Sequence, residues 1–520
     1  MNITRRVFCA TLAGSALPAA APRDAFDPAR FRRYNDEFNR RDLDTAERAI
    51  GNSAVWEWLS ANVPLFECPD RDIEEIYWYR WWTYRKHIRA TPDGFVITEF
   101  LPDVNWAGKH NTISCAAGHH IYEGRWIQNK QYLDDYSVFW FRKGGDPRRY
   151  SFWAADAIYA RYLADGRAGM PVSLLPDLME NYAAWEKTHL DANGLFWQTD
   201  NRDGMEVSIG GSGCRATINS YMYGDAVAIA RIAEMAGRAE LASRYRAKAA
   251  QIKSGVERLL WDEAAGFYKV LPRGEGQALA GVRELHGYVP WYFHLPEASH
   301  AVAWKHLMDP QGFAARFGPT TAERRHPRFF FEDKHECLWN GPSWPYATTQ
   351  TLVALANLLN SQEQGFVSKR DYLGLLRTYA MSQHLKTEDG SVIPWIDEDL
   401  HPDTGEWIAR GLLHKLGRAD KDRGRYYNHS TFADLIITGL VGLRPRADET
   451  VEVNPLVPEG AWDYFRLDGI PYHGRRLAII YDRTGRRYHG GRGLRVLVEG
   501  RQVAASNRLD RVTGALPEKT

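Results

Sequence analysis

Several long stretches of the chain place apolar residues three and four positions apart, which is the period of a helix with one buried face. One of them is "SFWAADAIYARYLA" at 151–164. Many of these stretches carry alanine on one side, and small side chains let neighbouring helices approach closely. The pattern therefore predicts a mainly helical region over residues 22–445. The other stretches lie at 219–236, 238–259, 348–360, 371–385 and 431–443.

The helical stretches follow one another in pairs at a spacing of roughly fifty residues, without a detailed sequence repeat. Consecutive helical hairpins of this kind fit an (α/α)6 barrel, in which inner and outer helices alternate. The loops between them are long and carry glycine, tryptophan and acidic residues, and such loops in a compact domain are usually functional. We expect the functional site where these loops meet. They cover residues 99–115, 194–216, 325–346 and 391–429.

The hydrophobic pattern changes after residue 445. Short alternating runs such as "LAIIYD" and "LRVLVEG" follow one another, with turns between them at short intervals. Alternation with a period of two indicates strands with one buried face. We predict a small C-terminal β-sandwich domain over 446–510, packed beside the barrel, and a loose tail over 511–520.

The first residues, "MNITRRVFCATLAGSALPAAAPRD", have the features of an export signal. Arg5 and Arg6 precede a short apolar run, and small residues follow it. The segment also resembles a twin-arginine signal, so we predict a signal peptide over 1–21 and an exported protein, periplasmic or extracellular. The remaining sequence has no apolar run of about 18 residues, so we expect no membrane association after export.

Charge and cysteine content exclude several classes of function. The chain of 520 residues carries 66 Lys+Arg and 65 Asp+Glu, without a basic tract interleaved with aromatics, so we expect no nucleic-acid partner. The five cysteines form no C-x-x-C pair, which argues against a zinc site. We predict neither a metal nor a cofactor. The oligomeric state and the disulfide state of the cysteines stay undecided.

Two loops combine carboxylates with tryptophan. "WIDEDLHPDTGEW" at 395–407 contains five carboxylates between Trp395 and Trp407. "GLFWQTDNRDGMEVSIGGSGCRA" at 194–216 contains three more beside Trp197. Tryptophan faces stack on the C–H faces of sugar rings, and hydrolysis of a glycoside needs two carboxyl groups. The two loops therefore suggest a carbohydrate-binding cleft with an acid–base pair, provided that the fold brings them together.

The second loop also carries a family motif. "DGMEVS" at 203–208 resembles the "SGMDNSP" type of motif in the six-hairpin glycoside hydrolases, which include glycoside hydrolase family 63 and mannosylglycerate-hydrolase-like enzymes, grouped with trehalase. In that family the acidic residue after Gly-Met is the general acid. The resemblance assigns this role to Glu206, although glutamate is longer by one bond than the family's aspartate. Asp203, three positions earlier, is the main competing candidate.

Further stretches follow in the family's order. "LWNGPSWPYATTQTLVALANLL" at 338–359 resembles the "W-x-G-P-x-W" motif, which implies that Trp339 and Trp344 line the sugar site. "EDLHPDTGEW" at 398–407 resembles "E-x-Y-x-P-x-T-G", whose glutamate is the general base, here Glu398. The resemblance spans roughly residues 100–445 and implies an inverting glycosidase that removes a terminal sugar. By their position beside these carboxylates, Asp203, Trp197 and Trp395 are further candidates for substrate contact.

One departure concerns the family's early W-D pair, which holds the terminal sugar and is absent as such here. At the corresponding place stands "NTISCAAGHHIYEGRWIQ", residues 111–128. We expect His119, His120, Glu123 or Arg125 to replace its contacts, so the sugar can differ from glucose or mannose. Neighbouring positions on a helix point about 100° apart, which argues against one metal ion bound by both histidines.

Two other classes of function stay open. A polysaccharide lyase or sugar epimerase on the same barrel would use a tyrosine and a histidine, or two histidines, as its acid and base. The residues that permit this chemistry are His119, His120, Tyr426, Tyr427 and His429. A carbohydrate-binding protein without catalysis is the remaining alternative, although binding alone does not require two motif carboxylates.

Overall fold

The computed structural model describes residues 26–42, 44, 48–274 and 276–518. The predicted export signal over 1–21 lies outside the described residues. Within them, no helix combines the length and the apolar character needed to cross a membrane.

The core of the helical region is a closed ring of helical segments that contact one another in chain order. The ring closes between α4 and the segment around η7, because the Glu123 carboxylate on α4 accepts hydrogen bonds of 2.8–3.0 Å from the backbone N–H groups of Phe432, Ala433 and Asp434. The segments of this ring are α4 (Ala117–Gly124), α6 (Ala154–Asp165), α8 (Ala216–Met235), α10 (Val289–Tyr292), α11 (Pro345–Ser361) and η7 (Leu435–Leu440).

Other helices alternate with the ring segments along the chain and cover the ring from outside. Most of them bury one face only, as the predicted period requires; in α9, for example, Leu241, Tyr245 and Ile252 are buried while Arg244 and Arg246 face solvent. These helices are α3 (Arg71–His87), α5 (Gln131–Arg142), α7 (Gly169–His189), α9 (Ala239–Leu259), η6 (Ala298–His306) and α12 (Lys369–Ser382). The alternation is consistent with an α/α barrel.

Helix α3 differs from the other outer helices, since it is buried on nearly every side. The N-terminal helices α1 (Arg32–Arg40) and α2 (Val55–Asn62) cover its outer face. Its sequence, "RDIEEIYWYRWWTYRKH", shows no clean helical period, because aromatic and charged residues both occur in its buried positions. The helix begins at Asp70, whose carboxylate accepts a hydrogen bond of 3.2 Å from the backbone N–H of Ile73.

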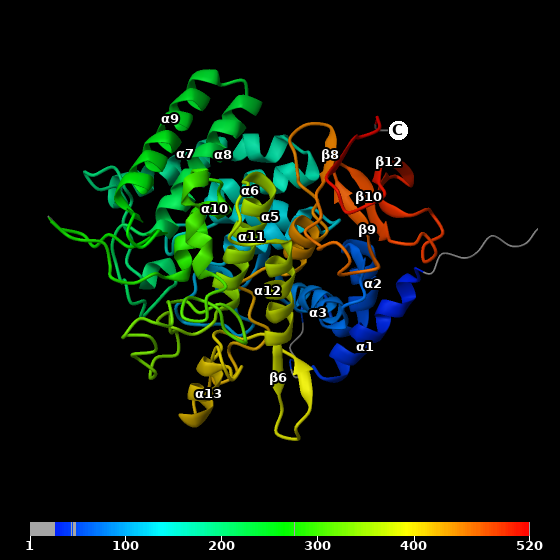
Figure 1. Cartoon of the computed structure of the whole chain (residues 1–520), viewed down its shortest axis with the longest axis horizontal. Coiled ribbons are helices and arrows are strands. Elements are labelled where there is room, and N and C mark those ends of the chain that lie inside the picture. The colour runs from blue at the N-terminus through cyan, green and yellow to red at the C-terminus, as the bar shows by residue number, and fades with distance from the viewer. Residues whose placement is uncertain (1–25, 43, 45–47, 275, 519–520) are drawn as a thin grey trace, which may run out of the picture.

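The C-terminal region contains a five-stranded antiparallel sheet beside the helices (Figure 1). Its strands, in spatial order, are β1 (Leu65–Glu67), β9 (Tyr464–Tyr472), β10 (Arg475–Asp482), β11 (Gly493–Val498) and β12 (Arg501–Ser506). A separate pair joins β8 (Thr450–Val453) to β13 (Val512–Ala515), which also contacts β12. Buried and partly buried residues alternate in the first part of β9, as the sequence pattern predicts, and the end of the strand is buried throughout.

Two boundaries differ from the sequence-based prediction. The expectation of a loose tail from residue 511 is wrong for 512–515, because these residues pair with β8 as strand β13. The edge strand β1 comes from the N-terminal part of the chain, where Phe66 pairs with Leu467 of β9. The sheet is therefore attached to the N-terminal helices as well as to the end of the chain, which Figure 1 shows next to α1 and α2.

The remaining elements are short and lie in the loops between the helices. Among them, β6–β7 and helix α13 extend from one end of the helical region (Figure 1). The short strand pairs are β2 (Ile88–Thr91) with β3 (Gly94–Ile97), β4 (Trp261–Asp262) with β5 (Phe267–Tyr268), and β6 (His384–Lys386) with β7 (Val392–Pro394); helix α13 covers Ile408–Lys415.

Candidate active site

A cavity of about 290 Å³ lies among the loops that precede the ring helices. Both motif carboxylates, Glu206 and Glu398, line it, although they lie far apart in the sequence. The lining comes largely from the loops that precede α4, α6, α8, α11 and η7, so closure of the ring is what brings these loops together. The polar lining also includes Glu99, Cys115, Tyr150, His335, Glu336, Cys337, Arg423, Tyr427 and His429.

Glu206 reaches the cavity from the loop before α8. The next residue, Val207, has a left-handed backbone with φ of 63°, a strained conformation for a β-branched residue. The backbone carbonyl of Glu206 accepts a hydrogen bond of 3.0 Å from the N–H of Trp339, which ties this loop to the tryptophan motif. Its side-chain Oε2 accepts a hydrogen bond of 2.8 Å from the Cys337 thiol.

Burial raises the pKa of the Glu206 carboxyl above its ordinary value, while the hydrogen bond from Cys337 opposes the rise. Phe196, Trp197 and Met205 precede Glu206 in the same loop, but none of them lines the cavity. The cavity wall next to Glu206 is instead formed by Cys337 and Trp339. The loop that precedes α11 therefore forms part of the surroundings of the Glu206 carboxyl.

Glu398 lies in the loop between β7 and α13 and is 4% exposed. Its Oε1 accepts a hydrogen bond of 3.0 Å from Nε of Arg423, which is also buried. Burial raises the pKa of Glu398 to about 7, although the Arg423 guanidinium acts in the opposite direction. This carboxyl is therefore close to half ionised at neutral pH.

The acidic neighbours of Glu398 are both buried and hydrogen-bonded to the loop. The Asp397 carboxylate accepts hydrogen bonds from the backbone N–H of Glu398 and from the Trp395 indole, at 3.0 and 3.2 Å. The Asp399 carboxylate accepts one of 3.0 Å from the backbone N–H of Ala409. Their oxygens are thereby used to fix the loop that carries Glu398.

Trp339 and Trp344 form an aromatic wall of the cavity, as their motif predicts. Their rings stack at a centroid distance of 4.9 Å and an interplanar angle of 15°. The Trp344 indole donates to the backbone carbonyl of Leu338 at 2.6 Å, which fixes its orientation. An aromatic face beside carboxylates suits a ligand with polar edges and C–H faces, such as a sugar.

The structure adds a third carboxyl to the cavity, Glu99, which the sequence analysis did not identify. Its Oε1 accepts a hydrogen bond of 2.6 Å from the Tyr427 hydroxyl. Burial raises its pKa to about 8, with repulsion from Glu398 and Glu206 adding to the effect. Glu99 follows the short strand β3 and belongs to no motif, so the only signal in the sequence was its position at the start of a long loop.

Asp203 does not line the cavity, so the prediction that it contacts substrate is not supported. It is 1% exposed, and its carboxylate forms an ion pair of 2.8 Å with Nε of Arg215. It also accepts hydrogen bonds from the hydroxyls of Ser151 and Thr217. Its acceptor capacity is used by neighbours that fix the start of α8, which is a structural role.

The residues predicted on α4 do not line the cavity either. His120 binds the Tyr136 hydroxyl and the backbone carbonyl of Asn428, at 2.9 and 2.5 Å. Arg125 forms an ion pair of 2.7 Å with Asp434. His119 is fully buried, with its ring packed edge-on against Trp153 and Tyr346.

These contacts, together with the contacts of Glu123, connect α4 to its neighbours in the ring. We expected residues of this helix to replace the sugar contacts of the family's W-D pair. The geometry does not support that expectation.

Trp197 and Trp395, which were candidates for substrate contact, lie outside the cavity lining. Trp197 stacks on His189 at 4.8 Å, with the guanidinium of Arg273 at 4.0 Å from its ring. Trp395 is 3% exposed and holds Asp397, as described above. Neither residue lines the cavity. Proximity in sequence to a motif carboxylate therefore did not imply proximity to the site.

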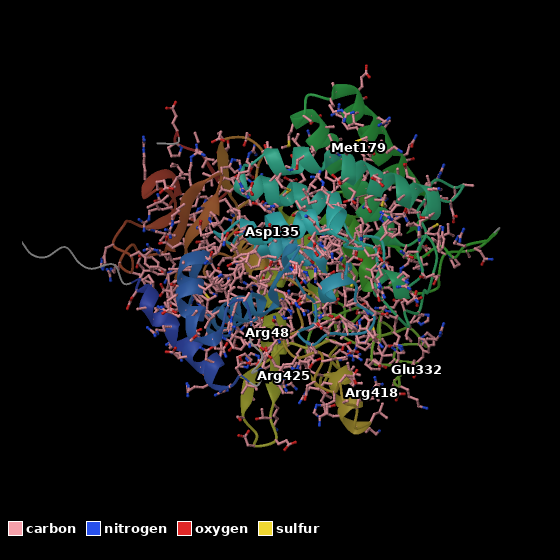
Figure 2. All side chains as sticks on the ribbon, turned by 180° about the vertical axis from the view of Figure 1, so that it is seen from behind. Arg48, Asp135, Met179, Glu332, Arg418 and Arg425 are labelled. Carbon is pink, nitrogen blue, oxygen red and sulfur yellow. The ribbon has the colours of Figure 1, made fainter. Side chains whose placement is uncertain are left out.

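A second cleft of about 740 Å³ borders the cavity. Arg423 lines both, so its guanidinium forms part of the wall between them. Arg48 and Arg425, labelled in Figure 2, line the second cleft. Asp44, Asp103, Asp420 and Asp422 line it too, so this cleft combines charges of both signs.

A helical ring with a carboxylate-lined, tryptophan-walled cavity defines a glycosidase-like protein, and comparison with known families agrees. Residues 109–430 match the family described as "Mannosylglycerate hydrolase MGH1-like glycoside hydrolase domain". Residues 443–505 match "Glycosyl hydrolase family 65, C-terminal domain". The chain belongs to the MGH1-like glycoside hydrolase family, which confirms the resemblance inferred from the motifs and supports a glycosidase with a carbohydrate substrate.

Solved structures agree on the fold. A protein named "Sialidase" is 43% identical over 94% of this chain, with a TM-score of 0.88. This chain spans only 45% of that protein's length. α-L-Rhamnosidases from Dictyoglumus thermophilum and Streptomyces avermitilis have TM-scores of 0.53 and 0.51 at 12% and 14% identity. The matches cover 86% of this chain in each case, and 45% and 38% of those chains.

Proposed function

We propose that the protein is an inverting glycosidase that removes a terminal sugar, built on an (α/α)6 barrel, with Glu206 as general acid and Glu398 as general base. The observation that carries the proposal is the meeting of these two motif carboxyls at one cavity beside the stacked pair Trp339–Trp344. The cavity is at the small end of the range for ligand sites, which favours a single terminal residue over a long stretch of chain.

The two environments suit the two roles. In an inverting mechanism one carboxylic acid protonates the departing oxygen while a carboxylate removes a proton from the attacking water. Glu206 has no basic residue in hydrogen-bond or ion-pair contact within the described part of the chain, and burial favours its protonated form. Glu398 is paired with Arg423, which favours its ionised form and fixes its orientation. The Trp339–Trp344 pair supports the sugar ring between the two carboxyls.

We further propose a neutral sugar as the substrate. A sialidase acts on a sugar that carries a carboxylate, so the 43% identical relative makes such a substrate the second candidate. Four glutamates line the cavity, namely Glu99, Glu206, Glu336 and Glu398. Arg423, the arginine among the described lining residues, is already bonded to Glu398. A substrate carboxylate would therefore lie among carboxyl groups, with the guanidinium of Arg423 already engaged by Glu398.

The test is a panel of aryl glycosides that contains neutral pentosides and hexosides in both anomeric forms, together with an aryl sialoside. We expect turnover of one neutral class, and proton NMR of the first product should show the anomer opposite to that of the substrate. Activity restricted to the sialoside would overturn the neutral-sugar proposal, and retained configuration would overturn the inverting mechanism. An unsaturated, ultraviolet-absorbing product would instead indicate a lyase that uses Tyr427 and His429.

We also propose that the protein acts outside the cytoplasm, on the basis of the arginine pair and apolar run within residues 1–21. N-terminal sequencing of protein recovered from the producing cells tests this, with a new terminus near residue 21 expected. Recovery of the intact Met1 terminus would contradict export by cleavage.

A further inference from the structure

Glu99 is a carboxyl at the cavity that the proposed acid–base mechanism does not use. Its backbone carbonyl accepts a hydrogen bond of 3.0 Å from the N–H of Asn428, which holds the segment after β3 against the segment before η7. The residue is 3% exposed yet lines the cavity. A buried ionisable side chain that faces a ligand site invites a functional explanation.

The two oxygens of this carboxyl have different surroundings. Oε1 accepts a hydrogen bond of 2.6 Å from the Tyr427 hydroxyl. Oε2 has the Cys115 thiol at 3.9 Å, which is a long and weak contact. A carboxyl oxygen buried in protein normally has a good hydrogen-bond partner, so Oε2 is the atom with capacity to bind a ligand in the cavity.

His335, which lines the same cavity, has its Nδ1 hydrogen-bonded to the backbone of Cys337. The groups that act on the Glu99 carboxyl carry no positive charge. Besides Tyr427 and Cys115, they are the carboxyls of Glu206 and Glu398 and the phenols of Tyr136 and Tyr150. Arg423 lines the same cavity but is bonded to Glu398. His429, whose ring centroid lies 3.8 Å from that of Tyr427, is held neutral because burial lowers its pKa well below the ordinary value. A carboxyl in such surroundings keeps its proton instead of remaining charged.

We propose that Glu99 is a sugar-binding residue that works as a neutral carboxylic acid and hydrogen-bonds a hydroxyl of the substrate through Oε2. This deepens the proposed function, on which it rests, by naming a specificity determinant of that site. Tyr427 donates to Oε1, so Oε1 is the carbonyl-like oxygen and Oε2 carries the proton. The acid therefore presents a donor to a hydroxyl oxygen, and a sugar that lacks this hydroxyl leaves a buried polar group unpaired.

The first test compares Glu99→Gln with Glu99→Ala on a substrate found with the glycoside panel. The amide is neutral at every pH and still donates, so Glu99→Gln should lower kcat/KM by no more than about tenfold, the scale of one altered hydrogen bond. The Ala variant removes donor and acceptor and should lose at least about a hundredfold. Thermal unfolding of both variants checks that each one is folded.

The pH profile makes the test specific for a protonated carboxyl. The wild-type enzyme should lose activity above about pH 8, as Glu99 ionises and ceases to donate. Glu99→Gln should abolish this loss. In Tyr427→Phe the loss should move to higher pH, because a donor to the ionised carboxylate has been removed. An unchanged alkaline limb in Glu99→Gln would overturn the proposal.

Deoxygenated substrates identify the contact. A single deoxy position should weaken turnover by the wild-type enzyme but have little further effect in Glu99→Ala, since both changes remove the same hydrogen bond. Additive effects at every position would show that Glu99 does not contact the sugar. A loss in Glu99→Gln as large as that in Glu206→Gln would also overturn the proposal, because it would make Glu99 a proton-transfer group.

A spectroscopic measurement separates this inference from the proposed function. At pH 7 the infrared spectrum of the wild-type protein should contain a protonated-carboxyl band that is absent from Glu99→Gln. This holds whether or not any glycoside is turned over. If the band is present and no glycoside is hydrolysed, the proposed function fails; if hydrolysis occurs and the band is absent, the role of Glu99 fails.

Discussion

Glu206 and Glu398 reach the same cavity from different loops, and the loops hold them by different chemistry. Glu206 is half-buried, and its side chain accepts a hydrogen bond from a thiol, a weak neutral donor. Glu398 is almost completely buried and accepts from a guanidinium. The less buried carboxyl therefore has the weaker partner, and the more buried one has a counter-ion.

The difference explains how two residues of one type can act as acid and base. A carboxyl without a counter-ion in a partly apolar wall is stabilised in its protonated form, whereas an arginine neighbour stabilises the carboxylate. Burial acts on both groups, so Arg423 is the element that distinguishes them. Substitutions around Glu206 and substitutions around Glu398 should then differ in their effects on rate, pH dependence and leaving-group dependence.

The largest effects are expected from replacing each carboxyl by its amide. Glu206→Gln and Glu398→Gln should each lower kcat/KM on an unactivated substrate by at least about a hundredfold, the usual contribution of a general acid or base. With a good leaving group such as dinitrophenolate, Glu206→Gln should recover most of the loss, because little protonation is needed. Glu398→Gln should stay slow, because activation of water is still missing.

Steady-state kinetics with a leaving-group series measures this difference. Asp203→Asn is a suitable comparison, since Asp203 lies in the Glu206 motif but outside the cavity; its effect should appear in stability and not in the leaving-group dependence. Full activity of either Gln variant would remove that residue from the mechanism. Recovery of Glu398→Gln with the good leaving group would reverse the two roles.

The pH dependence of kcat/KM should report the ionisation of Glu398. Glu398 acts as a base only when ionised, and its pKa is raised to about 7. The ionised fraction falls as the pH falls below this value, so kcat/KM should decrease about tenfold per pH unit on the acidic side. A rate profile that stays flat from pH 5 to 7 would show that Glu398 is not the titrating base.

The sequence predicted the mainly helical region and the two motif carboxyls that line the cavity, because both signals are local. A helix with one buried face shows its period over a few consecutive turns, as in α9, and the Glu206 and Glu398 motifs are short. Helix α3 was not predicted, because burial on nearly all sides removes the alternation of apolar and polar positions. Strand β1 was not predicted either, since three residues are too few to display an alternating pattern.

Residues that depend on contacts between distant loops could not be derived in this way. Glu99, Cys337 and Arg423 belong to no motif and acquire their roles only where the loops meet. Conversely, His119 and Arg125 have side chains typical of ligand sites, but the closed ring directs them into packing and an ion pair. Chemistry alone did not separate a buried structural residue from a cavity residue.

A smaller effect is expected when Arg423 is replaced. Arg423→Gln keeps a hydrogen-bond donor but removes the positive charge, so the pKa of Glu398 should rise above about 7. Each unit of this rise would lower kcat/KM about tenfold on the acidic side. The measurement is the acidic limb of the pH profile, which should move upward. Arg423→Lys keeps the charge and serves as the matched control; an unmoved limb in Arg423→Gln would show that the guanidinium does not tune the base.

The smallest effect belongs to the thiol beside Glu206. Cys337 donates to the Glu206 carboxylate and opposes the rise in its pKa, so Cys337→Ala should raise that pKa further. A neutral hydrogen bond contributes little, and a change in kcat/KM of about two- to tenfold is expected, confined to substrates that need protonation of the leaving group. Cys337→Ser keeps a donor and should restore most of the loss. A stronger effect with good leaving groups than with poor ones would mean that Cys337 influences the activation of water. The thiol would then not act through the acidity of Glu206.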